Sequence, residues 1–348
     1  MLDPGMRRPC RANMNCIETI PGLVSTIVPV YNRARMVQEA VRSVLDQAYR
    51  PIELLLVNDG STDDSGAVLD QLARAHPEAI RVIHKQNGGP GPAREAGRLA
   101  VRGEFIQYLD SDDWLLPGKF EMQVKALRDH PECGIAYGQS RFVDEAGDVI
   151  EQPSKRTGNR YDSLFPMLLV ERWWHTHTPL YRRELSDAIG PWPAHRPEDW
   201  DWDARAGALR TRLIYCDAVL SCQRAHGGEN RVSEGPRDAY DRDEAWFLPR
   251  LYQCALAAGV DAQGPEMWHF SRWAFALTRS LAMRGEGALA QEMVALARMA
   301  APKPQWDVIM MAGTARLLGW TRAAGMAENL RRVFRRAPGR HTMPGSGW

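Results

Sequence analysis

The N-terminal half of the chain repeats one pattern, in which a short apolar segment rich in β-branched residues is followed by an amphipathic stretch. The apolar segments predict buried strands over 25–32, 51–59, 81–85 and 104–110. Apolar residues recur at the spacing of one helix face over 37–45, and further helices are expected near 68–72 and over 92–101. Because strands that are apolar throughout need cover on both faces, the pattern predicts a largely parallel α/β sheet flanked by helices.

The second half of the chain has a different texture. It is irregular and rich in Trp, Pro and His over 135–230, with strand candidates at 134–144 and 212–221. Beyond about 236, helical patterns separated by Gly and Pro are expected over 268–283, 286–299, 308–318 and 324–334. We therefore divide the chain into a flexible leader over 1–20, an α/β domain over 21–235 and a helical region over 236–348.

The charge balance and the cysteine pattern argue against several classes of protein. The chain has 44 basic and 43 acidic side chains, a net charge of +1, so it lacks the positive surplus of a nucleic-acid binder. No apolar run approaches the ~20 residues that span a bilayer, and the first residues lack the apolar core of a secretory signal. The 6 cysteines are scattered without a CxxC pair, which favours free thiols in a reducing compartment. We expect a cytoplasmic protein that binds no nucleic acid.

Polar side chains follow three of the predicted strands. Asn32 comes after the first, Asp59 after the second, and Asp110, Asp112 and Asp113 after the fourth. Because ligands of open α/β sheets bind outside the carboxyl ends of the strands, these side chains should converge on one rim. Three carboxylates so close together repel unless a cation or hydrogen-bond donors compensate, and Mg²⁺ or Mn²⁺ suits such oxygen ligands. The alternative interpretation is a solvated acidic turn at the start of a helix.

The glycine-rich segment NGGPGPAREAG, residues 87–97, is expected to be a loop that enters a helix. It is not a dinucleotide-binding fingerprint, because the third glycine would fall at Arg94 and the segment follows the third strand instead of the first. No GxxxxGK[ST] segment occurs, so the usual signature of ATP or GTP hydrolysis is missing. Its backbone amides and Arg94 are still available to a nucleotide.

Six segments, taken in order along the chain, resemble glycosyltransferase family 2. They are IVPVYN, LLVNDGSTD, NGGPGPAREAG, FIQYLDSDDW, TPLYRRELSDAIGPW and PEDWDWDAR, and the resemblance spans about residues 24–232. It implies the GT-A fold, a Rossmann-like, mostly parallel sheet flanked by helices, followed here by a C-terminal helical subdomain. It also implies a nucleotide-binding half over about 21–130 and an acceptor half over about 131–235.

The same resemblance assigns a donor site. Pro29, Tyr31 and Asp59 would hold the nucleotide base, with Asp59 accepting a hydrogen bond from a ring N–H. Asn32 and Arg94 would lie nearby as further ligands of the nucleotide-sugar.

The acidic segment after the fourth strand resembles the DxD motif of the family. Asp110 would lie near the ribose and Asp112 would bind Mn²⁺ or Mg²⁺, with Asp113 as a further or alternative ligand. His226, in QRAHGGEN, resembles a segment that closes over the diphosphate, and it could also bind the metal. Glu95 stands where the family usually has Asn and adds a negative charge near the donor pocket.

Glu198 and Asp199 resemble the ED pair of the family, with Asp199 as catalytic base and Glu198 at the nucleotide-sugar. In an inverting displacement the acceptor hydroxyl attacks C1 opposite the diphosphate and must lose its proton. A metal on the DxD segment would stabilise the charge that builds on the diphosphate. The plain alternative is an acidic helix start, and Asp201 and Asp203 are lesser candidates for the base.

The function predicted from the resemblance is metal-dependent, inverting transfer of a sugar from a nucleotide donor, expected to be a UDP-sugar, to a hydroxyl group. The acceptor is expected to be a glycan or a lipid-linked glycan in polysaccharide or glycoconjugate synthesis. One alternative is a GT-A module that binds nucleotide or glycan without turnover. A nucleotidyltransferase is a third candidate, but its Gly-rich basic loop after the first strand is missing.

The basic segment RRVFRRAPGR, residues 331–340, ends the last predicted helix. Such an amphipathic basic end could rest on an anionic membrane and keep a cytoplasmic chain peripheral to it, near a lipid-linked acceptor. The plainer interpretation is a solvated helix end.

Overall fold

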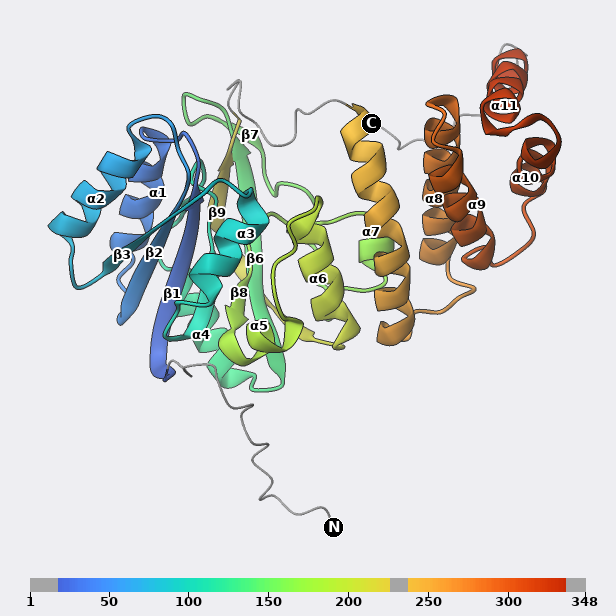
Figure 1. Ribbon diagram of the computed structural model, residues 1–348. Helices are drawn as coiled ribbons and strands as arrows, with labels where there is room; N and C mark the ends of the chain where they lie inside the picture. The colour runs from blue at the N-terminus through green and yellow to red at the C-terminus, as the bar shows by residue number, and fades with distance from the viewer. Residues whose placement is uncertain (1–17, 226–236, 336–348) are drawn as a thin grey trace.

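The computed structural model describes residues 18–225 and 237–335 of the chain. Its strands form one sheet in the order β3-β2-β1-β4-β8-β6-β9-β5, with β7 paired to β6 (Figure 1). The strands are β1 (Ile20–Val30), β2 (Ile52–Asp59), β3 (Ile80–Lys85), β4 (Gly103–Tyr108), β5 (Trp114–Leu115), β6 (Cys133–Val143), β7 (Val149–Glu151), β8 (Leu180–Arg182) and β9 (Arg212–Arg224).

The four strands expected in the N-terminal half are present and parallel, in the order β3-β2-β1-β4. The second half makes the sheet mixed, because β8 pairs antiparallel with both β4 and β6, whereas β6 and β9 are parallel. The prediction of an α/β sheet is confirmed, and the antiparallel strands are the part that its first-half pattern did not reveal.

Helices cover both faces of the sheet, and the side-chain alternation of the strands decides which contacts each face makes. Val28 and Leu56 belong to one apolar cluster with α1, α2 and α4, whereas Ile27, Leu55 and Ala93 belong to the cluster on the face of α3, α5 and α6. These helices are α1 (Met36–Leu45), α2 (Ser65–Ala75), α3 (Pro90–Arg98), α4 (Lys119–Asp129), α5 (Arg183–Ile189) and α6 (Glu198–Ala208).

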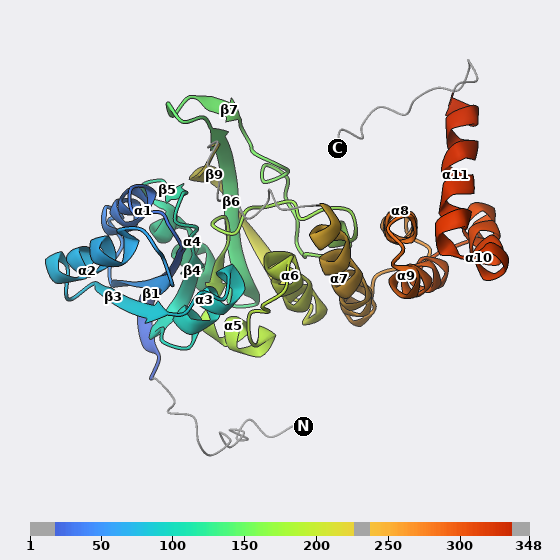
Figure 2. The ribbon, with the colours of Figure 1, turned by 45° about the horizontal axis from the view of Figure 1, so that its top comes forward.

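The C-terminal helices continue away from the α6 side of the sheet, as Figures 1 and 2 show. They are α7 (Arg237–Ala258), α8 (Pro265–Met283), α9 (Gly287–Met299), α10 (Trp306–Leu318) and α11 (Trp320–Arg335). The last four correspond to the expected helices. The pattern did not predict α7, whose apolar residues lack a clear one-sided periodicity and whose interior holds Pro249.

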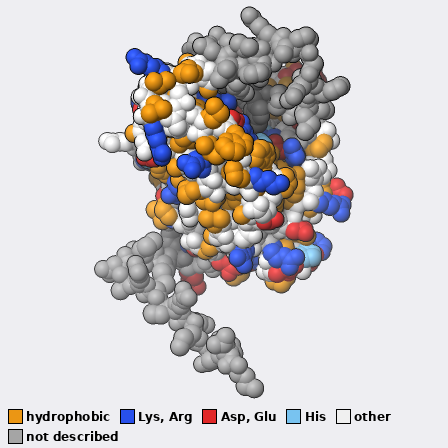
Figure 3. Space-filling model, turned by 90° about the vertical axis from the view of Figure 1, so that its right-hand side faces the viewer, with side chains coloured by type: hydrophobic (Ala, Val, Ile, Leu, Met, Phe, Trp, Pro, Cys, Tyr) orange, Lys and Arg blue, Asp and Glu red, His pale blue; other side chains and the backbone are white. Residues whose placement is uncertain are grey.

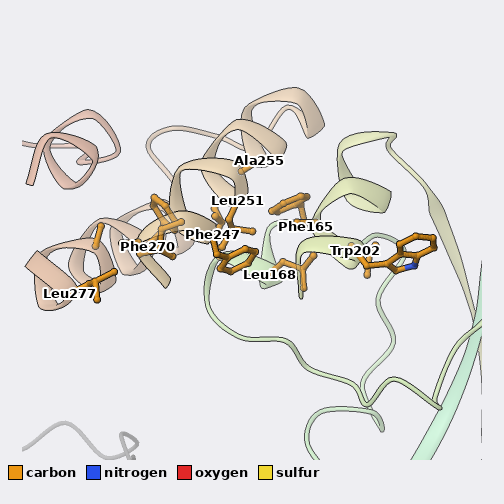
Figure 4. Packing of buried hydrophobic residues seen from close by; sticks show 14 of the residues in the cluster. Phe165, Leu168, Trp202, Phe247, Leu251, Ala255, Phe270 and Leu277 are labelled. Atoms are coloured by element: carbon orange, nitrogen blue, oxygen red, sulfur yellow. The ribbon is translucent and has the colours of Figure 1, made fainter. Parts of the chain in front are cut away.

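The helical region and the α/β sheet share one apolar core. Figure 4 shows Phe247 and Leu251 of α7 between Phe270 of α8 and the side chains of Phe165 and Leu168. All five belong to the cluster that also contains the α3 face of the sheet. The helical region is therefore packed against the wall that holds the site described below.

Among the described residues, no helix is both long and apolar enough to cross a membrane. The boundaries proposed for the leader, the α/β domain and the helical region stay predictions.

Candidate active site

A cleft with a volume of about 700 Å³ opens at the carboxyl ends of β1, β2 and β4. This is the place where open α/β sheets bind their ligands. The starts of α3 and α6 complete its wall, and α7 and α8 add residues from the helical region. The predicted site residues that line the cleft are Pro29, Tyr31, Asp59, Arg94, Asp110, Asp112, Asp113, Glu198 and Asp199.

Two predicted site residues are not among those that line the cleft. Asn32 accepts a hydrogen bond from the Thr62 backbone N–H at 2.8 Å, and its own N–H donates to Ser61 Oγ at 3.1 Å. It adopts φ 51°, a left-handed conformation that Asn tolerates better than most residues. Asn32 thus joins the end of β1 to the turn after β2. His226 lies outside the described residues, and the ligand roles expected for both residues stay predictions.

The Asp59 carboxylate anchors the loop that leads into α3. It accepts hydrogen bonds from the backbone N–H groups of Gly88 and Gly89, at 3.0 and 2.7 Å, and from Lys85 Nζ at 2.5 Å. Gly89 has φ 88°, which favours glycine at this position. A carboxylate offers about four acceptor positions, so three chain donors leave one for a ring N–H of a bound base.

Arg94 joins the two halves of the site. Its guanidinium is almost fully buried and donates through Nη2 to Asp110 Oδ1 at 2.7 Å and through Nη1 to Glu198 Oε1 at 2.8 Å. Burial raises the pKa of Glu198 and the adjacent charge of Asp199 adds to this effect, while Arg94 opposes it. The segment after β4 and the start of α6 are therefore held together by one cation.

The negative charge that Glu95 was expected to add near the donor pocket is compensated by neighbouring groups. Its carboxylate takes two hydrogen bonds from Arg98, at 2.7 and 2.8 Å, and one from the Trp192 backbone N–H at 3.0 Å. The carboxylate is paired within α3 and helps to hold the segment before α6.

The carboxylates of the acidic segment after β4 differ in burial and in their partners. Asp113 is nearly buried, with Oδ2 at 2.8 Å from His177 Nδ1 and Oδ1 accepting the Arg224 backbone N–H at 3.0 Å. Burial raises the pKa of Asp113 to about 6, against the opposing charge of His177. Asp112 is more open, with 24% of its side chain exposed and Arg33 Nε at 3.9 Å.

The donor set fits a hard divalent cation only if substrate oxygens complete the coordination. Within 18–225 and 237–335, no group of three or more His, Cys, Asp and Glu side chains is placed to hold a metal. Mg²⁺ is commonly bound by one or two carboxylates plus substrate phosphates and water. Asp110 and Asp112 can supply that pair, because both line the cleft and are 31% and 24% exposed at their side chains.

Asp199 lies at the start of α6 and faces the cleft with 29% of its side chain exposed. Its Oδ2 lies 2.8 Å from Arg172 Nη1. Burial alone would raise the pKa of Asp199, but the cations Arg172, Arg94 and Lys155 hold it below its usual range. The group is consequently an anion at neutral pH and can accept a proton. Of the lesser candidates, Asp201 is fully buried and paired with Arg205 and Arg250.

Sequence reasoning missed several residues that line the cleft or contact its carboxylates. Arg33, directly after the first polar strand end, could have been found by asking which cations follow the strands. Arg172 carries no local signal, because it approaches Asp199 only through the fold. Tyr240 and Trp273 also line the cleft, yet they belong to the helical region to which no role could be assigned from sequence.

Comparisons with known proteins point to one family. The family model described as "Glycosyl transferase family 2" matches residues 25–190. An uncharacterized glycosyltransferase of Rickettsia typhi is 33% identical over 241 residues, which cover 67% of this chain and 74% of the relative. A relative from Rickettsia conorii, also an uncharacterized glycosyltransferase, is 40% identical over 222 residues, or 61% of this chain. The chain spans only 36% of the length of that relative and of one from Rickettsia felis.

Solved structures with the same fold cover both the sheet and the helical region. The 1–349 segment of S. aureus TarS matches with a TM-score of 0.64 at 17% identity, over 89% of this chain and 91% of that chain. The mannosyltransferase PcManGT of Pyrobaculum calidifontis matches with a TM-score of 0.51 at 17% identity, over 90% and 88% of the two chains. The strand order of the sheet and the similarity to these solved structures together define a GT-A glycosyltransferase fold. The chain belongs to glycosyltransferase family 2.

Proposed function

We propose that the chain transfers a sugar from a UDP-sugar to a hydroxyl group of a glycan, with inversion at the anomeric carbon. The observation that carries this proposal is that two acidic groups line one cleft. Asp110 and Asp112 follow β4, Asp199 lies at the start of α6, and Arg94 joins Asp110 to Glu198, the neighbour of Asp199. A nucleotide diphosphate and an attacking hydroxyl need these two kinds of group on opposite sides of the sugar.

The donor half would hold the nucleotide by the residues after β1, β2 and β4. Asp59 would accept the uracil N–H at its remaining acceptor position, and Pro29 and Tyr31 would pack against the base. TarS has been solved with UDP and with UDP-GlcNAc, and PcManGT with GDP-Man and Mn²⁺. The preference for uridine in our proposal follows the better structural match.

Asp110 and Asp112 would hold Mn²⁺ or Mg²⁺ together with the donor diphosphate. The bound ion would stabilise the negative charge that develops on the departing UDP. Arg33 and Arg224, which line the same part of the cleft, add positive charge on the side of the diphosphate. Arg94 would orient Asp110 through the hydrogen bond of 2.7 Å from its Nη2 to Asp110 Oδ1.

Asp199 would take the proton of the acceptor hydroxyl. Its carboxylate is kept ionised by Arg172 and remains accessible from the cleft, as a general base requires. The acceptor would lie against Trp200 and Trp273, whose ring centroids are 5.2 Å apart at an angle of 35° and which both line the cleft. Aromatic faces of this kind suit the apolar faces of sugar rings.

Calorimetric titration of UDP, first with Mn²⁺ and then with EDTA, tests the donor half without an identified acceptor. We expect binding that is strong with Mn²⁺, weak with EDTA, and equally weak in Asp112→Ala under both conditions. GDP or dTDP binding in place of UDP would reject the uridine donor. Metal-dependent UDP binding without turnover of any UDP-sugar would instead favour a binding module.

A further inference from the structure

Helix α10 is apolar on two opposite faces. Val308, Met311 and Ala315 are buried against the neighbouring helices. Trp306, Met310 and Leu317 are 75%, 67% and 85% exposed. The spacing i, i+4, i+11 places these three side chains on one stripe of the helix, opposite the buried face. A helix with apolar side chains on opposite faces normally buries both faces. The exposed stripe therefore indicates a further contact surface.

Further exposed apolar side chains are present at the C-terminal end of α10 and on the two helices next to it in the chain. Met299 at the end of α9 is 63% exposed, Leu318 at the end of α10 is 45% exposed, and Met326 of α11 is 50% exposed. Figure 3 shows apolar side chains gathered on this side of the molecule, with Lys and Arg side chains among and around them. We call the six residues Met299, Trp306, Met310, Leu317, Leu318 and Met326 the α10 patch.

The charge around the α10 patch is predominantly positive. Residues 298–327 contain the basic side chains of Arg298, Lys303, Arg316 and Arg322, all exposed, and one acidic side chain, Asp307. Asp307 is paired with Arg272 of α8 at 2.8 and 3.1 Å, so its negative charge is compensated. The sequence then continues with Glu328 and the basic segment 331–336, which contains four Arg residues.

We propose that the α10 patch docks on the surface of an anionic lipid bilayer. Trp306, Met310 and Leu317 would enter the level between headgroups and acyl chains, where exposed Trp and long apolar side chains are stabilised. The surrounding Arg and Lys side chains would face the lipid phosphates, which attract basic residues near the bilayer surface. This proposal does not depend on the reaction proposed for the cleft.

Charge favours the bilayer over a second copy of the chain as the occupant. A two-fold dimer through this patch would bring the same surface together twice and oppose its basic rim to itself. Like charges at such a contact repel, whereas an anionic membrane attracts them. The patch lies at the end of the molecule opposite α1 and α2, so docking would leave the sheet and its cleft away from the lipid (Figures 1 and 2).

Vesicle cosedimentation of the full chain tests the proposal. We expect binding to vesicles of phosphatidylcholine mixed with phosphatidylglycerol, little binding to phosphatidylcholine alone, and weaker binding as salt rises. Trp306→Ser with Leu317→Ser should lower the partition coefficient about 10-fold or more, because two apolar side chains that would enter the bilayer are lost. Leu99→Ser is the matched control, since Leu99 is 50% exposed but lies in the turn after α3. These surface changes leave the core intact, and a thermal melt checks this.

Three results would overturn the proposal. The first is no binding to anionic vesicles, and the second is equal binding by the double variant and the wild-type chain. The third is a dimer, measured by light scattering, that Trp306→Ser with Leu317→Ser converts to monomer, which would assign the α10 patch to a second copy of the chain.

Discussion

The guanidinium of Arg172 lies 2.8 Å from the carboxylate of Asp199 and connects the proposed base to a buried ion cluster. Arg172 Nε also lies 2.7 Å from Asp203 Oδ2, and the same carboxylate oxygen accepts a hydrogen bond from Trp174 Nε1 at 2.8 Å. Lys155 donates to the backbone carbonyls of Arg172 and Trp174. The orientation and the charge of Asp199 thus depend strongly on Arg172, which does not itself line the cleft.

Removing the cation at residue 172 should move the acid limb of the pH–rate profile. In the wild-type chain the lowered pKa of Asp199 keeps the base ionised as pH falls, so activity is lost only below the usual carboxylate range. In Arg172→Gln the pKa of Asp199 should rise, and activity should be lost at higher pH. The rate at neutral pH should also fall, by on the order of 10- to 100-fold, because Asp199 loses its anchor. Initial rates across pH measure both effects.

Arg172→Lys is the matched variant, since it keeps the charge but loses the guanidinium that contacts both Asp199 and Asp203. We expect a profile close to that of the wild-type chain with a lower plateau. UDP affinity, measured in parallel, should change little in either variant if the fold is kept. An unshifted acid limb in a folded Arg172→Gln chain would contradict the role assigned to Arg172.

Asp59→Asn should weaken UDP binding by about 10-fold, because an amide cannot accept all the donors that meet at this position and a charged hydrogen bond is lost. The loop at Gly88 and Gly89 should also loosen, since both of its N–H groups bond to Asp59. Titration calorimetry measures the affinity. Asp64→Asn removes the same charge from an exposed residue outside the cleft and should leave the affinity for UDP unchanged.

Trp273→Ala should raise the KM for the acceptor by about 10- to 100-fold while UDP affinity stays within about 2-fold, because the change removes one aromatic side of the proposed acceptor wall. Trp268→Ala, in the same helix, is the control, since Trp268 is 43% exposed and is not among the residues that line the cleft. An equal change in the two variants would show that the acceptor does not lie against Trp273.

Gly97→Ala should lower the free energy of unfolding by about 1–3 kcal/mol. An added Cβ would lie 2.4 Å from Ile27 Cγ2 in β1, so α3 would have to move away from the sheet. Gly313→Ala in α10 meets nothing within 4 Å and should stabilise the chain by about 0.5–1 kcal/mol through helix propensity. Urea denaturation of the three chains measures the differences.

The sequence predicted most of what depends on local pattern. Strands β1, β2 and β4 are largely buried on both faces, and the polar residues at their ends converge because parallel strands end at one rim. The antiparallel strand β8 has only three residues, too few for a pattern, and its place between β4 and β6 depends on long-range pairing. Helix α7 escaped prediction because it is packed on several sides and so lacks one apolar face.

In the site, too, local segments were predictable from sequence and long-range contacts were not. Asp59, Asp110 and Asp199 could be chosen because each stands in a recognisable segment. Their partners could not, because Arg172 approaches Asp199 and His177 approaches Asp113 only when segments far apart in sequence meet. Such partners have no spacing that could reveal them, and their contacts decide which carboxylate is buried and which faces the cleft.

Asp199→Asn tests the central claim most directly, because it removes the proposed base while keeping the shape of the side chain. We expect release of UDP from the UDP-sugar in the presence of acceptor to fall by on the order of 10²- to 10⁴-fold. UDP affinity should stay close to that of the wild-type chain, as should the activity of Asp187→Asn, an exposed carboxylate outside the cleft. Transfer by Asp199→Asn at the wild-type rate would contradict the assignment of the base and the mechanism built on it.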